Sequence, residues 1–164
     1  MSTTPPAVPT GLLFPLHARP AESYMTSPRS FGSGRSNGRK HAGCDLYAPV
    51  GTPVRAMAGG KVLTALYSFY GGTYAIEIDH GTFVARYGEV QSAVADQLAV
   101  GATITPGQVI GQVGKLNNYH QSMLHLELYA GTETGALTDR AKKPYQRRGD
   151  LFNPSTWLDA ATAG

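Results

Sequence analysis

Residues 39–49 read Arg39-Lys40-His41-Ala42-Gly43-Cys44-Asp45-Leu46-Tyr47-Ala48-Pro49, and this stretch places two potential metal ligands, His41 and Asp45, four residues apart. A fully extended chain would hold these two residues about 13 Å apart, which is too far for one ion. Gly43 gives the backbone between them the freedom to bend, while Gly43, Pro49 and the strand-like residues that follow disfavour a helix. The stretch therefore predicts a bent strand or loop that turns both side chains toward one point.

An imidazole nitrogen and a carboxylate oxygen are a normal partial ligand set for zinc, which takes four near-tetrahedral ligands. A third protein ligand must come from elsewhere in the chain. A lone H-x-x-x-D pattern also arises by chance, and then His41 is a surface histidine and Asp45 caps a turn. The stretch alone leaves both interpretations open.

The composition indicates the class of fold. The chain has 164 residues, enough for one domain with a substantial core, and its 41% hydrophobic and 15% charged residues exclude disorder by composition. The 20 glycines and 11 prolines indicate many turns and short strands rather than long helices. We therefore predict a mainly β single domain of antiparallel sheets with few short helices.

Charge, cysteine content and terminal pattern limit the possible partners. The net charge of +3 favours an anionic partner, such as nucleic acid, an acidic polysaccharide or cell wall, without selecting one. Cys44 is the only cysteine, so no internal disulfide can form. No run of 18 apolar residues predicts a membrane span, and the first residues lack the basic and apolar pattern of an ordinary secretory signal.

Proline, glycine and charge patterns divide the chain into three parts. Prolines recur through residues 1–28, which predicts an extended N-terminal arm with a short apolar anchor at residues 12–14. We expect residues 29–130 to form the main domain and residues 131–164 to form a C-terminal extension packed on the same domain. Glycine and arginine alternate in residues 29–39, which predicts a loop that grips an anionic or carbonyl-rich substrate or simply lies in solvent.

Several segments of the main domain have the pattern of short strands. Residues 51–56 and 61–67 flank Gly59-Gly60, which predicts one hairpin, and residues 74–80 and 83–87 flank Gly81-Thr82, which predicts a second. That second hairpin ends at Glu89. Residues 93–98 predict a loop or short helical turn, residues 100–114 brief β segments, and residues 153–158 a capped helical turn.

The last strong strand pattern is Met123-Leu-His-Leu-Glu-Leu-Tyr129. Its three leucines share one face and are expected to point into the core, so His125 must lie on the opposite face. The candidates for one site are therefore His41 and Asp45 at a bend, His125 on the open face of a strand, and Glu89 at the end of a hairpin.

Four ordered motifs carry a family resemblance across roughly residues 30–130. In chain order, HAGCDLYAPVGTPVRAMAGGKV, YAIEIDHGTFVARYGEV, VGATITPGQVIGQVG and MLHLELY resemble the lysostaphin/LytM-type zinc endopeptidases, which cut peptide bridges in bacterial peptidoglycan. In that family, zinc is bound by the His and Asp of H-x-G-x-D and by the second His of H-x-H. The resemblance implies a groove with one zinc ion bound by His41, Asp45 and His125, leaving a fourth position for water or substrate.

The sequence departs from the family at two other positions. The first His of H-x-H and the His that closes Y-x-H are replaced by Met123 and Glu89. Methionine cannot exchange a proton, whereas glutamate can, so we predict that Glu89 is the general base; otherwise it is an exposed turn residue. His120, in the loop before the last strand, is a second candidate for the missing histidine, or else a surface residue.

Three further residues are candidates for the surroundings of the site. Glu127 lies two residues beyond His125 on the same strand face, where it could hydrogen-bond the ligand imidazole or face solvent. Tyr87 could line the groove and orient a substrate carbonyl, or pack in the strand. Arg39, beside His41, could contact substrate in the groove.

The resemblance implies a zinc-dependent peptidoglycan hydrolase that cleaves peptide bonds in stems or cross-bridges, with peptidoglycan rather than nucleic acid as its partner. Since no ordinary secretory signal is visible, we expect synthesis in the cytoplasm and delivery to the periplasm or cell wall by a secretion machine or a phage. The protein would then be an antibacterial effector or a phage-type lysin, with an immunity protein as a further possible partner. The alternative is a catalytically degenerate zinc-binding module that binds peptidoglycan or regulates another enzyme.

Overall fold

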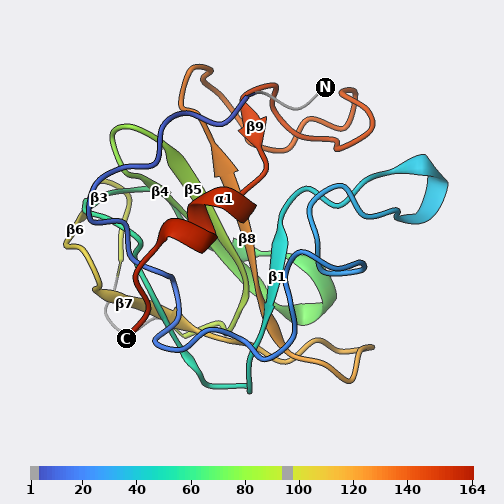
Figure 1. Ribbon diagram of the computed structural model, residues 1–164, viewed down its shortest axis with the longest axis horizontal. Coiled ribbons are helices and arrows are strands. Elements are labelled where there is room, and N and C mark those ends of the chain that lie inside the picture. Colours follow the sequence, from blue (N-terminus) through green and yellow to red (C-terminus); the bar gives the residue numbers. More distant parts are fainter. Residues whose placement is uncertain (1–3, 94–97) are drawn as a thin grey trace.

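The chain folds into two antiparallel sheets (Figure 1). The computed structural model describes residues 4–93 and 98–164. Within these residues it contains, in chain order, η1 (Ser36–Gly38), β1 (Cys44–Tyr47), β2 (Pro53–Arg55), β3 (Gly60–Ser68), η2 (Tyr70–Gly72), β4 (Tyr74–Asp79), β5 (Val84–Val90), β6 (Thr103–Ile104), β7 (Val109–Gln112), β8 (Met123–Tyr129), β9 (Leu151–Phe152) and α1 (Ser155–Ala160). The predicted class, mainly antiparallel β with few short helices, is confirmed.

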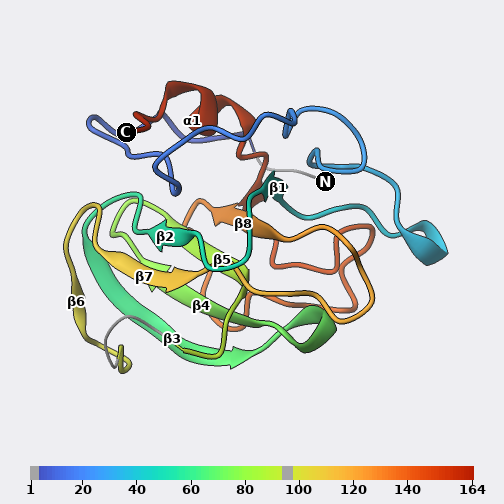
Figure 2. The same cartoon turned by 90° about the horizontal axis from the view of Figure 1, so that it is seen from below.

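The larger sheet has the strand order β1-β8-β5-β4-β3-β6, and β9 pairs with β8 beyond this path. Strands β2 and β7 pair separately in a small second sheet, which Figure 2 shows beside the larger one. Val54 and Ile110 of the small sheet share one apolar core with Leu124 and Leu126 of β8. The two sheets therefore enclose a common core, and β8 lies near its centre.

One of the two predicted hairpins is wrong. Strand β2 pairs with β7, whereas β3 pairs with β4 and β6, so the segments on either side of Gly59-Gly60 belong to different sheets. A Cβ atom on Gly60 would lie 2.3 Å from the carbonyl oxygen of Asp79, so this glycine is needed for close contact with the end of β4 rather than for a hairpin turn. The second predicted hairpin, β4–β5, is confirmed.

The other predicted segments have different outcomes. Strands β6 and β7 confirm the brief β segments expected in residues 100–114. Helix α1 confirms the helical turn near the C-terminus, and Asn153 Oδ1, two residues before its first residue, accepts a hydrogen bond from the Ser155 amide at 3.0 Å. Most of the predicted turn at residues 93–98 lies outside the described residues.

The segments before and after the main sheet both contribute to the core. Phe14 of the N-terminal segment and Trp157 of α1 are almost fully buried, and the Trp157 indole donates a hydrogen bond to the Pro6 carbonyl. The domain boundaries at residues 28 and 130 stay predictions. Within the described residues, no helix is long and apolar enough to cross a membrane.

The three leucines of β8 face the core, as the alternation predicts. The opposite face was expected to be open, but residues 131–151 cover much of it. Leu137 and Leu151 pack there with Tyr129 in a second, smaller apolar cluster. The part of this face around His125 borders a cavity.

Candidate metal centre

Strand register brings the first candidate residues together. Asp45 of β1 lies directly opposite His125 of β8, and Gly88 of β5 lies opposite His125 on the other side. Directly opposite residues in antiparallel strands have their Cβ atoms about 5 Å apart, so Asp45 and His125 are neighbours by construction of the sheet. His41 joins them because the chain bends at Gly43, just before β1.

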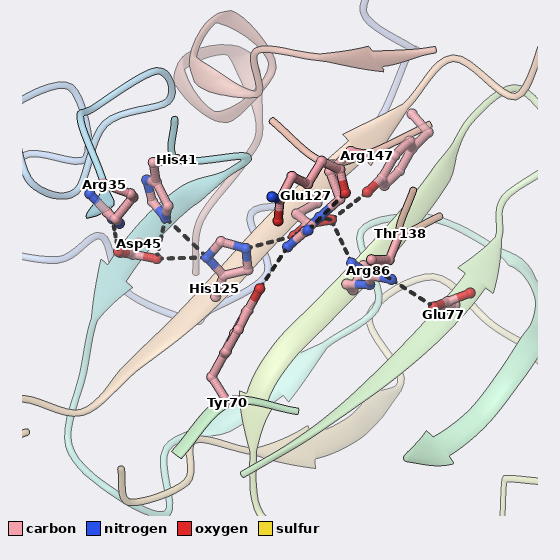
Figure 3. Close-up of polar contacts among 12 residues, drawn as sticks. Arg35, His41, Asp45, Tyr70, Glu77, Arg86, His125, Glu127, Thr138 and Arg147 are labelled. Atoms are coloured by element: carbon pink, nitrogen blue, oxygen red, sulfur yellow. Dashed lines mark hydrogen bonds and ion pairs between the residues drawn. The ribbon is translucent and has the colours of Figure 1, made fainter. Parts of the chain in front are cut away.

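Three ligand atoms meet at one point (Figure 3). Asp45 Oδ1 lies 3.1 Å from His41 Nε2 and 2.9 Å from His125 Nδ1, and the two histidine nitrogens are 3.2 Å apart. All three residues are buried. Within the described residues, these are the only histidine, cysteine or acidic side chains that form such a set.

Each imidazole is oriented by a hydrogen bond on its other nitrogen. His41 Nδ1 donates to the Ser30 carbonyl at 3.0 Å, and His125 Nε2 donates to Glu127 Oε1 at 2.9 Å. Since a neutral imidazole carries one proton, these bonds leave the lone pairs of His41 Nε2 and His125 Nδ1 directed at the centre of the set. Two lone pairs and a carboxylate oxygen thus converge where a cation would lie.

The spacing of the three atoms fits a zinc ion. Tetrahedral zinc with ligand distances of about 2.0–2.1 Å separates its ligand atoms by about 3.3 Å. The three observed separations, 2.9 to 3.2 Å, are close to that value. The residues and their geometry therefore fit a three-coordinate protein site with a fourth position free for another ligand.

The pKa values of the metal-free chain also indicate a site that binds a cation. Burial lowers the pKa of His125, but its hydrogen bonds to Asp45 and Glu127 outweigh burial and raise the pKa to about 10. Burial raises the pKa of Asp45, but hydrogen bonds from His125 and His41 bring it down to about 2. The site thus attracts positive charge, and a proton occupies it when no metal does.

Gly43 is needed for space as well as for the bend. A Cβ atom at this position would lie 2.2 Å from the Leu126 carbonyl oxygen and 3.1 Å from His125 Cε1. Any larger residue would push β1 away from β8 and separate Asp45 from His125. The glycine in the H-x-G-x-D motif therefore sets the distance between the two strands that carry the ligands.

Glu127 contacts His125 and is the last of three charged residues that lie side by side on neighbouring strands of the sheet. Glu127 lies opposite Arg86 of β5, which lies opposite Glu77 of β4. Arg86 donates to Glu127 at 3.0 Å, and Arg147 from the C-terminal segment donates to both Glu127 carboxylate oxygens at 3.0 and 3.1 Å. Burial raises the pKa of Glu127, but the two guanidinium groups hold it well below its usual value. An ionised Glu127 fixes the orientation of the His125 ring.

Glu89 reaches the site through a β-bulge. Tyr74 of β4 pairs with Val90 and Ala75 pairs with Gly88, so Glu89 is the extra residue on β5, and its φ of 62° is in the left-handed region. Its Oε2 atom is buried and has no hydrogen-bond partner among the described residues. Burial raises the pKa of Glu89 to about 7. An unpartnered carboxyl group with this pKa can accept or donate a proton near neutral pH.

A cavity of about 160 Å³ joins Glu89 to the three ligand residues, and Arg39 also lines it. Three further side chains that were not predicted from the sequence also line it: Arg35, Tyr70 and Arg147. Arg35 belongs to the glycine- and arginine-rich loop of residues 29–39, and the composition of that loop was the sequence feature that could have indicated its place in the site. Arg147 lies 22 residues beyond His125 in a polar segment, and no local pattern in the sequence connects the two.

The structure does not bring Tyr87, His120 or Met123 to this cavity. Tyr87 is fully buried, and its hydroxyl contacts the His80 ring and accepts a hydrogen bond from the Met57 amide. His120 is exposed in the loop before β8, where its ring packs on Tyr119. Met123 is buried at the start of β8, opposite Tyr47.

A larger cavity, of about 510 Å³, lies between residues 16–22 and residues 47–53. It is lined by none of the three ligand residues and not by Glu89. This cavity is the larger of the two, but the residues that can bind a metal ion and transfer protons line the smaller one. The smaller cavity is therefore the candidate site.

A buried His-Asp-His set with converging ligand atoms, on an antiparallel β sheet, is an arrangement that can bind one metal ion. The chain belongs to peptidase family M23, whose family model matches residues 39–137. It is 33% identical over 91 residues to the glycyl-glycine endopeptidase ALE-1 of Staphylococcus capitis, covering 56% of this chain and 25% of that protein. It is 30% identical over 89 residues to the peptidoglycan DD-endopeptidase ShyC of Vibrio cholerae, covering 54% of this chain and 20% of that protein.

Solved structures show the same fold. The antimicrobial peptidase lysostaphin from Staphylococcus simulans superposes with a TM-score of 0.62 and 25% sequence identity, covering 82% of this chain and 51% of that one. The chain thus spans about a quarter or less of the length of the two curated relatives and about half of the lysostaphin structure.

Proposed function

We propose that the protein is a zinc-dependent hydrolase that cleaves peptide bonds in peptidoglycan, in stems or cross-bridges. The observation that carries this proposal is the convergence of His41 Nε2, Asp45 Oδ1 and His125 Nδ1 within 3.2 Å of one another. Membership of family M23 and the names of two relatives, a glycyl-glycine endopeptidase and a peptidoglycan DD-endopeptidase, support peptidoglycan as the substrate.

Glu89 is the proposed general base. A bound zinc ion supplies Lewis acidity, which polarises a peptide carbonyl and acidifies water. Glu89 Oε2, which is buried and has no partner among residues 4–93 and 98–164, accepts a proton from the attacking water and returns it to the leaving amine. Its pKa of about 7 suits both transfers, because neither protonation state is strongly favoured at neutral pH.

The second candidate is a zinc-binding module without catalytic activity, which binds peptidoglycan or regulates another enzyme. Met123 favours it, because a methionine stands where the family resemblance implies a histidine that exchanges a proton. The intact ligand set and the titratable Glu89 favour the enzyme.

The proposed function implies a site of action where peptidoglycan lies, in the periplasm or the cell wall. Delivery by a secretion machine or a phage, as an effector or a lysin, stays a prediction from the sequence. An immunity partner stays a prediction as well.

Digestion of purified peptidoglycan by zinc-loaded wild-type protein, Glu89→Gln and His125→Ala tests the proposal. We expect wild type to release soluble fragments, Glu89→Gln to keep its zinc but lose roughly 100- to 10,000-fold in rate, and His125→Ala to lose zinc and activity together. His120→Ala, an exposed histidine outside the cavity, is the matched control and should behave as wild type. Fully zinc-loaded wild type that releases nothing would establish the non-catalytic module instead.

A further inference from the structure

The cavity beside the metal centre contains a cation that the proposed mechanism does not use. Arg39 lines it together with the ligand residues and Glu89. The guanidinium of Arg39 lies 6.0 Å from the centre of the Tyr70 ring. Within residues 4–93 and 98–164, its side chain makes no hydrogen bond or ion pair, so its five N–H groups are available to a ligand.

The neighbouring arginines have partners. Arg147 is bound to both oxygens of Glu127. Arg35 donates to the Pro28 carbonyl at 2.9 Å, and its Nη2 atom lies 3.7 Å from Asp45 Oδ2 (Figure 3). Among the described residues, Arg39 is therefore the one arginine lining this cavity that forms no ion pair.

A short hairpin positions Arg39 and Arg35 together. The Arg35 amide donates to the Arg39 carbonyl at 2.7 Å, and the Arg39 amide donates to the Ser36 carbonyl at 3.2 Å. A β-bridge between Gly34 and Lys40 closes the same hairpin one residue further out. The backbone of this loop is thus hydrogen-bonded across its two arms, and both arginines extend from it to the cavity.

The charge balance of the cavity selects an anionic ligand. Apart from Arg147, which is paired with Glu127, two arginines, Arg35 and Arg39, line it together with the carboxyl groups of Asp45 and Glu89. Asp45 is engaged by both histidines, and a metal ion bound there would add positive charge. A guanidinium pairs best with a planar carboxylate, through two parallel hydrogen bonds.

The volume of the cavity limits which carboxylate can enter. At about 160 Å³ it is smaller than the pockets that hold whole drug-sized ligands, about 300–1,000 Å³. It therefore suits the end of a peptide, a small residue with its terminal carboxylate, better than the middle of a chain. The hairpin of Arg35 and Arg39 forms part of its wall.

We propose that Arg39 binds the C-terminal carboxylate of the substrate peptide, so that the protein removes the last residue of a peptidoglycan stem. This inference rests on the proposed function. In the reaction, water adds its oxygen to the carbonyl carbon of the penultimate residue and the C–N bond breaks. The leaving nitrogen takes a proton by way of Glu89, and the products are a free amino acid and a peptide shortened by one residue.

Two pairs of synthetic peptides test the proposal, an N-acetylated peptide ending in D-alanyl-D-alanine and N-acetylated tetraglycine, each as the free acid and as the C-terminal amide. Zinc-loaded wild type should release one residue from at least one free acid and cleave the matching amide roughly 10- to 100-fold more slowly, the range expected for lost hydrogen bonds to a charged group. Arg39→Gln should lose that preference without losing zinc. Arg39→Lys, which keeps the charge but not the fork of donors, should lose part of it.

Lys40→Gln is the matched control, because it removes the same charge from the neighbouring exposed residue, which does not line the cavity. It should keep the wild-type preference. Equal use of acid and amide by wild type, or an unchanged preference in Arg39→Gln, would overturn the carboxylate site while leaving the hydrolase intact.

A binding measurement separates this inference from the proposed function. Calorimetric titration of zinc-loaded Glu89→Gln with each acid and amide reports recognition without turnover. Tighter binding of a free acid, abolished by adding Arg39→Gln, would support the carboxylate site even if peptidoglycan were not cleaved. No difference between acid and amide in both pairs would overturn the site even if peptidoglycan were cleaved.

Discussion

Glu89 differs from Asp45 and Glu127, because its Oε2 atom has no hydrogen-bond partner in the part of the chain that the structure describes. Asp45 is bound to two histidines, and Glu127 is bound to two arginines. Burial without such a partner raises the pKa of Glu89 from its usual 4.5 to about 7. Burial without a partner thus suits Glu89 to proton transfer, but it also destabilises the folded chain when the carboxyl group is ionised.

The stability effect of Glu89→Gln should therefore depend on pH. Between pH 4.5 and about 7 the folded metal-free chain keeps a proton on Glu89 that the unfolded chain has released, so the wild type loses stability as the pH rises through this window. Glutamine does not titrate, so the variant should gain on the wild type by about 2–3 kcal/mol between pH 4.5 and 8. Denaturant unfolding of both proteins with chelator present, at the two pH values, measures this difference. An equal difference at both values would contradict the raised pKa.

At the residue scale, the sequence was informative where chemistry and short spacing coincide. His41, Asp45 and Gly43 lie within one motif, and strand alternation placed His125 on the correct face. Tyr87 was harder, because a tyrosine suits either a wet groove or a core, and only its neighbours in β4 and β8 show that it is buried. The part played by Arg147 depends on how the C-terminal segment folds back over β8, which no local pattern encodes.

The β-bulge in β5 sets the direction of the Glu89 side chain at a cost in backbone energy. A glutamate with φ of 62° adopts a conformation that costs a residue with a side chain about 1–2 kcal/mol. The bulge thus directs the Glu89 side chain into the cavity at the expense of local backbone stability, as strained residues at functional sites often do.

Glycine at position 89 should relieve this strain. We expect Glu89→Gly to be more stable than Glu89→Gln by about 1 kcal/mol, since both lack the carboxylate but only glycine accepts a positive φ readily. Denaturant titrations of the two variants at one pH provide the measurement. A Glu89→Gly variant less stable than Glu89→Gln would show that the bulge is not strained.

Strand β8 carries both a metal ligand and the residue that orients it. Replacing Glu127 by glutamine keeps the shape but leaves the buried guanidinium group of Arg147 without its carboxylate and that of Arg86 with only Glu77, at 3.4 Å. We expect a loss of about 3–5 kcal/mol in the free energy of unfolding and a 10- to 100-fold loss in zinc affinity. Denaturant titration and competition with a chromophoric chelator measure the two effects.

Glu133→Gln is the control for this prediction. Glu133 forms a largely exposed ion pair with Lys142 at 3.6 Å, so its loss should change stability by less than about 1 kcal/mol and leave zinc affinity unchanged. Equal effects of the two substitutions would argue against a special role for the buried carboxylate.

Among the elements, those with local partners were predictable and those with distant partners were not. Strands β4 and β5 are joined by a short turn, and their alternation and glycine punctuation were enough to pair them. Strand β2 pairs with β7, more than 50 residues away, and nothing in either segment specifies that partner. Gly60 was read as a turn residue because the sequence does not show the close contact with β4 that requires it.

For the molecule as a whole, a bound metal would tie distant parts of the chain together. His41 and His125 are separated by 84 residues and lie on opposite sides of the β4–β5 hairpin in the sequence. A ligand that binds only the folded chain stabilises it by about 2.7 kcal/mol at 100 times its Kd.

Zinc should therefore raise the melting temperature of wild type by roughly 5–10 °C at that concentration, given about 2–4 °C per kcal/mol for a chain of this size. Chelator should reverse the rise. Calorimetry of wild type, His41→Ala and the control His17→Ala tests this, and only His41→Ala should lose the response. A response that survives in His41→Ala would place the metal elsewhere.

The most direct test of the proposed peptidase activity is mass spectrometry of purified peptidoglycan digested by the zinc-loaded protein in ¹⁸O-labelled water, with Glu89→Gln at equal zinc content as the comparison. We expect products of peptide-bond cleavage in which each new carboxyl group contains one ¹⁸O atom, at a rate that falls at least about 100-fold in Glu89→Gln. Labelled products formed equally fast by Glu89→Gln, or no labelled products from the wild type, would contradict this expectation.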